Sequence, residues 1–73
     1  MIALTALERK AAFVAAATLH QDTKMAAAEK CGVSWQHLLY VLDGEREPSA
    51  ELRERVAEYV GMPVSQLFPD IAA

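Results

Sequence analysis

The feature that most limits the fold is the regular return of residues that begin and end helices. Ser, Thr and Asp cap helix N-termini, whereas Gly and Pro end helices because Gly accepts a left-handed backbone and Pro lacks an amide proton. Residues of these kinds stand at Thr5, Asp22, Thr23, Gly32, Ser34, Gly44, Pro48, Ser49, Gly61 and Pro63. No segment between them alternates apolar and polar residues in the manner of a strand. The sequence therefore predicts an all-α chain of short helices.

Five helical segments fit between these boundaries. The predicted ranges are about 5–19, 24–30, 35–42 and 49–60, followed by a short turn that starts at 64 or 65 and ends at 68. Thr5 and Glu8 have the spacing of a capping box, which supports the first start. Apolar spacing predicts one core, made of Ala28, Val33, Leu38, Val41, Leu52, Val56 and Leu67. In the first helix, the predicted stripe consists of Leu7, Ala11, Val14 and Thr18, with Leu4 and Ala15 alongside it.

Length, cysteine content and hydropathy limit the kinds of function. Seventy-three residues form a single domain, 1–73, whose small core leaves no room for a large cofactor cleft. The one cysteine, Cys31, fits a core position, and its spacing from His20 and His37 matches no catalytic or metal motif. We therefore expect no enzyme, no cofactor, no metal and no small-molecule substrate. The apolar run 11–19 is far shorter than the roughly 20 residues of a membrane span, so we expect a cytoplasmic protein with no membrane contact.

Charge is unevenly distributed along the chain. The formal net charge is −3, which opposes non-specific attraction to nucleic acid. Residues 1–37 carry four basic and three acidic side chains, whereas residues 38–73 carry three basic and seven acidic ones. The acidic excess lies in the C-terminal half, so a neutral to basic surface can exist elsewhere.

The stretch from Thr23 to Pro48 combines a short helix, a glycine turn and a second helix. A small residue at the helix crossing and a glycine in the turn let two such helices pack at a steep angle. The residues at these places and at the seat of the second helix are Ala28, Gly32, Val33, Leu38 and Val41, with Gly44 and Pro48 following in G-x-x-x-P spacing. This pattern resembles the helix-turn-helix of the phage-repressor and Cro-like (XRE-type) DNA-binding family. The resemblance implies a lambda-repressor-like bundle of four to five short helices, with the motif at about 23–44.

The resemblance also implies a role for the second motif helix, whose N-terminal side chains enter the major groove. The implied base-reading residues are Ser34, Trp35, Gln36, Leu39 and Tyr40. Gln36 is the strongest candidate, since a glutamine amide can pair with adenine N6 and N7. The implied phosphate contacts are Lys24, Arg46 and His37. We therefore expect a sequence-specific transcriptional regulator, a small repressor or Cro-like protein that binds double-stranded DNA.

A second interpretation stays open beside DNA binding. The acidic balance, together with an apolar patch of Trp35, Leu39 and Tyr40, suits a protein-interaction module of the same fold, such as an anti-repressor or an antitoxin-like partner. Trp35 could also fold back onto the core, because tryptophan is usually largely buried.

One short helix offers few contacts to DNA, so a homodimer is expected. Two copies would place two helices in half-sites about 34 Å apart. The predicted pairing residues are Val64, Leu67, Phe68 and Ile71. The alternative is that Leu67 and Phe68 close the bottom of the core.

Overall fold

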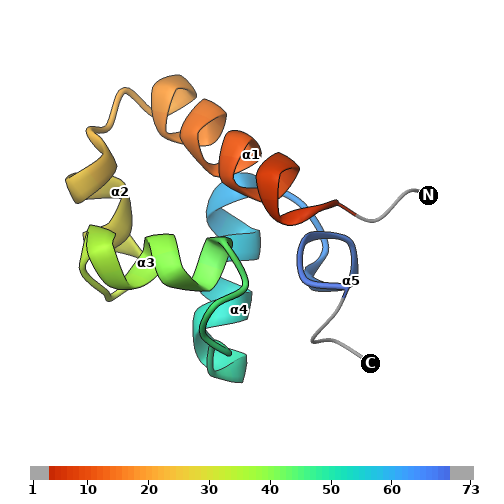
Figure 1. The fold of residues 1–73 in the computed structure, drawn as a ribbon. Coiled ribbons are helices and arrows are strands. Elements are labelled where there is room, and N and C mark those ends of the chain that lie inside the picture. The colour runs from red at the N-terminus through yellow and green to blue at the C-terminus, as the bar shows by residue number, and fades with distance from the viewer. Residues whose placement is uncertain (1–3, 70–73) are drawn as a thin grey trace.

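Five helices make up the described part of the chain. The computed structural model describes residues 4–69, and no strand occurs among them (Figure 1). The helices are α1 (Ala6–Leu19), α2 (Lys24–Lys30), α3 (Trp35–Leu42), α4 (Ala50–Val60) and α5 (Val64–Leu67). The all-α class is confirmed, and each predicted boundary lies within one residue of the observed one. Within 4–69, no helix has the length and apolar character needed to cross a bilayer.

Hydroxyl caps set four of the helix starts. The side chains of Thr5, Thr23, Ser34 and Ser49 each accept a hydrogen bond from the amide three residues later, at 3.1–3.2 Å. The Thr5 amide in turn donates to Glu8 Oε1 at 3.0 Å, which completes the predicted capping box. Gly32, between α2 and α3, has a φ of +88°, a left-handed conformation that favours glycine. The predicted hydroxyl caps therefore begin these helices, and Gly32 forms the predicted turn after α2.

The helices α2 and α3 form the helix-turn-helix unit, and the other helices pack around it. In Figure 1, α1 lies above α4, and α5 lies near the start of α1. The Leu4 amide donates to the Gln66 carbonyl at 3.1 Å, which ties the two ends of the described chain together. Six predicted core residues are at most 6% exposed: Ala28, Leu38, Val41, Leu52, Val56 and Leu67. The seventh, Val33, is half-buried against the same cluster.

The helix α1 turns a different face inward from the one predicted. Its buried residues are Arg9, Phe13, Ala16 and Ala17. In contrast, Leu7 is 78% exposed, and Ala11 and Thr18 are exposed as well, so the predicted stripe is wrong. Residues 11–19 carry no charge, and apolar spacing alone therefore fits more than one face of this helix. Phe13 decides the face, because its fully buried ring packs against Trp35 of α3 and Tyr59 of α4.

Arg9 is a charged residue in the interior, 2% exposed. Its Nε donates to the Leu42 carbonyl at 2.9 Å, and its Nη1 donates to the Leu67 carbonyl at 3.1 Å. The guanidinium also lies 5.0 Å from the centre of the Phe68 ring. Leu42 ends α3 and Leu67 ends α5, so one side chain of α1 supplies donors to carbonyls that helix ends leave unpaired. Arg9 thereby joins α1, α3 and α5.

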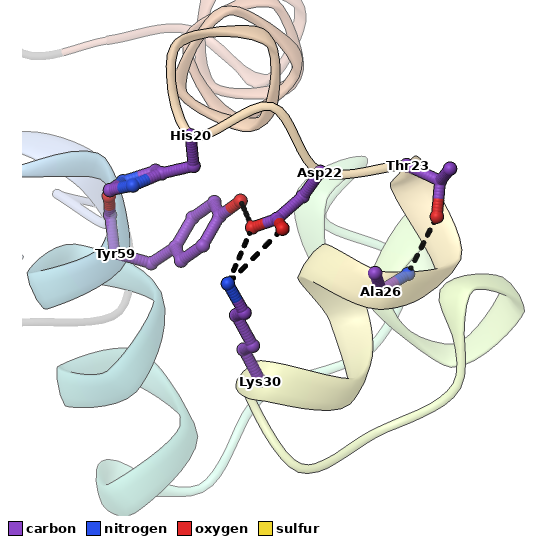
Figure 2. A network of polar contacts seen from close by, with 6 residues as sticks. All are labelled: His20, Asp22, Thr23, Ala26, Lys30 and Tyr59. Carbon is purple, nitrogen blue, oxygen red and sulfur yellow. Dashed lines mark hydrogen bonds and ion pairs between the residues drawn. The ribbon is translucent and has the colours of Figure 1, made fainter.

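A polar network holds the connection between α1 and α2 against α4 (Figure 2). The Lys30 ammonium donates to both Asp22 carboxylate oxygens at 3.1 and 2.9 Å, and the Tyr59 hydroxyl donates to Asp22 Oδ2 at 2.7 Å. His20 Nε2 lies 3.1 Å from the Tyr59 carbonyl, which accepts its proton. Asp22 therefore fixes the start of the helix-turn-helix unit to the C-terminal half of α4.

This network gives a pH-dependent contribution to stability. The hydrogen bonds from Lys30 and Tyr59 lower the pKa of Asp22 below its ordinary value of 3.8. A carboxylate whose pKa is lowered by folding stabilises the native state above its unfolded pKa, and that stabilisation is lost as the pH falls through the folded pKa. Urea unfolding should show the wild type more stable than Asp22→Asn above about pH 5, with the difference shrinking below pH 3.8.

A difference between the two proteins that stayed constant down to acidic pH would contradict this assignment. Glu8, whose pKa is also lowered by its bonds to Thr5, is present in both proteins and cancels in the comparison.

Tyr59 gives a contribution to stability that is lost at alkaline pH, whereas that of Asp22 is lost at acidic pH. Burial and the Asp22 carboxylate raise the pKa of Tyr59 to about 12, so its contribution is present below the ordinary value of 10.0 and is lost as the pH rises through about 12.

The C-terminal segment closes the core. Leu67 and Phe68 are fully buried, and Val64 is half-buried against the same cluster. Assigning Leu67 and Phe68 to a dimer surface is therefore wrong, because the ring of Phe68 lies under Arg9 and neither side chain is exposed. Ile71 lies outside the described residues, and Val64 alone remains as a predicted pairing residue among those described.

Candidate nucleic-acid interface

The cap at Ser34 and the apolar spacing of α3 fix which of its side chains face outward. Leu38, Val41 and Leu42 are fully buried, and they seat the helix on the core. On the opposite side, Gln36 is exposed and Tyr40 is 39% exposed. Leu39 and His37 are half-buried and lie at the two margins of the outward face. The outward face of α3 therefore carries an amide and a phenol near its centre.

Five of the predicted DNA-contacting residues line one shallow hollow in the surface. These residues are Ser34, Gln36, His37, Tyr40 and Arg46. The hollow combines hydroxyl, amide, imidazole, phenol and guanidinium groups, and no carboxylate lines it. It can therefore donate hydrogen bonds to base edges and attract phosphate at the same place.

Lys24 and Trp35 lie together at the start of the motif. Trp35 is half-buried, and its ring stacks on Phe13 with centroids 6.1 Å apart and an interplanar angle of 27°. The Lys24 ammonium lies 5.8 Å from the centre of the Trp35 ring. Trp35 thus packs partly on the core, which agrees with the alternative prediction that it folds back onto the core. The Lys24 ammonium lies near its ring.

Arg46 returns over α3 from the loop that follows it. Gly44 has a φ of +82°, and the amides of Glu45 and Arg46 both donate to the Tyr40 carbonyl, at 2.9 and 3.3 Å. These bonds hold the loop beside α3, where the Arg46 guanidinium lies 5.7 Å from the centre of the Tyr40 ring. The loop geometry therefore brings a basic residue back beside the outward face of the helix.

Acidic residues border this surface on one side. Asp43, the C-cap residue of α3, is exposed, as are Glu45 and Glu47 in the following loop. A second hollow, between the motif turn and α4, contains Glu47 and Glu51 among its lining residues. The positive part of the surface is therefore limited to the region of Lys24, the first turns of α3 and Arg46.

Sequence reasoning missed the support beneath this surface. Phe13 holds Trp35 from below, although it belongs to α1 and is 22 positions away in the chain. Its large side chain could have indicated the buried face of this helix, since Phe13 is the one aromatic residue in the alanine-rich stretch 11–19. The predicted C-terminal pairing residues lie in the core or outside the described residues, so they form no part of this surface.

Comparison with models of known protein families, with curated proteins and with solved structures found no match. Among residues 4–69, no three His, Cys, Asp or Glu side chains lie close enough together to hold a metal ion.

Proposed function

We propose that the protein is a sequence-specific DNA-binding transcriptional regulator that inserts α3 into the major groove. The observation that carries this proposal is the hollow lined by Ser34, Gln36, His37, Tyr40 and Arg46. It lies on the outward side of a short helix whose opposite side is buried, which is the arrangement that a reading helix needs. The spacing of the motif resembles that of phage repressors, and it supports the same proposal.

In this proposal each polar group has a defined role. The Gln36 amide pairs with the major-groove edge of adenine, and the Ser34 hydroxyl bonds to a neighbouring base or phosphate. Lys24, Arg46 and His37 contact phosphates and set the orientation of the helix on the duplex. The mechanism is occupancy of an operator, with no catalytic step.

The alternative is a protein-interaction module that keeps this fold. The observations that favour it are the net charge of −3 and the exposed carboxylates of Asp43, Glu45 and Glu47 beside α3. In that case Tyr40 and the exposed part of Trp35 would contact a protein partner. The two proposals differ in their response to salt and to base sequence.

Two substitutions should weaken DNA binding in different ways. Gln36→Ala should relax the preference at one base position by about 1–3 kcal/mol, since it removes one bidentate contact. Lys24→Ala should weaken binding to all sequences alike and lower the slope of log K against log salt concentration by about 0.9, since it removes one phosphate contact. Selection from randomised duplex followed by fluorescence anisotropy at several salt concentrations measures both effects.

The control is Lys10→Ala, which removes a positive charge from α1 without touching the hollow. A palindromic selected sequence would support a dimer on two half-sites. If selection enriches no sequence, and if Gln36→Ala and Lys24→Ala leave duplex binding as weak as in the wild type, the DNA-binding proposal is wrong and the interaction module is favoured.

A further inference from the structure

Two aromatic residues of α3 each lie beside a cation that comes from outside this helix. The Lys24 ammonium, from the start of α2, is 5.8 Å from the centre of the Trp35 ring. The Arg46 guanidinium, from the loop after α3, is 5.7 Å from the centre of the Tyr40 ring. Both distances are within the range of about 6 Å in which a ring face attracts a cation. The two cations are those predicted to contact phosphate.

The protein supports the two pairs in different ways before any ligand binds. Trp35 is backed by Phe13, which is fully buried and packs in turn against Tyr59 with centroids 5.2 Å apart. The Tyr40 carbonyl accepts the amides of the loop that carries Arg46. The core therefore fixes the Trp35 ring, and backbone hydrogen bonds hold the loop of Arg46 beside Tyr40.

Lys24 and Arg46 differ from Lys30 and Arg55, which are paired with carboxylates. Lys30 pairs with Asp22, and Arg55 pairs with Glu51. Within residues 4–69, by contrast, neither Lys24 nor Arg46 forms an ion pair, and both are exposed. A ring orients a cation without neutralising it, whereas a carboxylate would cancel the attraction to phosphate. Lys24 and Arg46 thus lie beside rings, with no carboxylate paired to them that would cancel their attraction to phosphate.

We propose that Trp35 and Tyr40 are positioning residues, which hold Lys24 and Arg46 at the two ends of α3 so that each meets a DNA phosphate. This inference rests on the proposed DNA-binding function and assigns the two aromatic residues to phosphate positioning, in place of base reading. Holding a long side chain in place before binding reduces the entropy lost when it contacts phosphate. Base selection is then left chiefly to Gln36 and Ser34.

Tyr40 provides the sharper test because it is exposed and can be changed with little effect on the core. Tyr40→Phe keeps the ring and should bind DNA more tightly than Tyr40→Leu, with a salt slope like that of the wild type. Tyr40→Leu removes the ring and should weaken binding about two- to fivefold, the range that an exposed cation–π contact supplies, with a smaller salt slope. The base preference obtained by selection should stay the same in both variants.

The dependence on Arg46 is tested by a double-mutant cycle. If Tyr40 acts through Arg46, Tyr40→Leu should have no further effect on DNA binding in an Arg46→Ala background. Trp35→Phe and Trp35→Leu are compared in the same way in a Lys24→Ala background, with thermal unfolding measured to detect loss of the packing on Phe13. A Tyr40→Phe variant that loses binding or changes base preference would overturn the inference, because the hydroxyl would then be the contacting group.

A measurement without DNA separates this inference from the proposed function. Ring currents should shift the Arg46 δ-methylene protons upfield in the wild type and in Tyr40→Phe, but not in Tyr40→Leu. Normal DNA binding with no ring-current shift, or with equal salt slopes in Tyr40→Leu and wild type, would overturn the inference alone. A wild type that shows the shift but binds no duplex would overturn the proposed function, and the positioning role with it.

Discussion

Replacing Phe13 with Ala is expected to lower the free energy of unfolding by about 3–5 kcal/mol, which is the usual cost of removing a buried aromatic ring. Replacing Leu7 with Ala, six residues earlier on the same helix, should change it by less than about 0.5 kcal/mol. A chain of 73 residues has a total stability of about 4–11 kcal/mol, so the first change removes a large share of it.

The reason lies in the face that α1 turns inward. Phe13 is fully buried, and its ring packs against both Trp35 of α3 and Tyr59 of α4. Leu7 is 78% exposed, so little apolar surface returns to water when it is shortened. If the apolar stripe through Leu7 faced the core, Leu7→Ala would cause the larger loss of stability and Phe13→Ala the smaller one.

Urea unfolding followed by circular dichroism measures both variants under the same conditions. Phe13→Leu serves as an intermediate, because it keeps most of the apolar volume and should cost less than the alanine variant. A Leu7→Ala variant that lost as much stability as Phe13→Ala would show that the assigned face of α1 is wrong.

Replacing Arg9 is expected to have the second large effect. Arg9→Met removes the donors to the Leu42 and Leu67 carbonyls and should cost about 2–6 kcal/mol, since each buried carbonyl left without a partner costs about 1–3 kcal/mol. The methionine keeps an apolar stem of similar length, so the loss would reflect the missing hydrogen bonds more than an empty cavity. Chemical unfolding, with the transition followed by circular dichroism, gives the value.

Two further variants identify what Arg9 contributes. Arg9→Lys keeps the charge but lacks the planar fork that reaches two carbonyls at once, so we expect an intermediate loss of stability. Lys10→Ala, at the next position and only half-buried, should change stability by less than about 0.5 kcal/mol. An Arg9→Met variant as stable as the wild type would mean that apolar packing replaces the guanidinium without penalty, as happens for some buried charges.

Helix boundaries and the outward face of α3 could be predicted from the sequence because they depend on neighbours in the chain. A cap such as Ser34 bonds to an amide three residues away, and Gly32 is required by its own backbone angle. The face of α3 was also determined locally, since Leu38 and Val41 are separated from Gln36 and Tyr40 by helical spacing between apolar and polar residues. The gathering of Ser34, Gln36 and Tyr40 around one hollow follows from the same spacing.

The tertiary structure alone decided what α1 and α5 contribute. In the uncharged stretch 11–19 several faces are equally apolar, and the choice depends on whether Phe13 finds Trp35 and Tyr59, which are distant in the chain. The burial of Arg9 depends on the carbonyls of Leu42 and Leu67, which are 33 and 58 positions away in the chain. A buried charge needs acceptors or an opposite charge around it, and here those acceptors come from distant backbone carbonyls, which leave no periodic signal in the sequence.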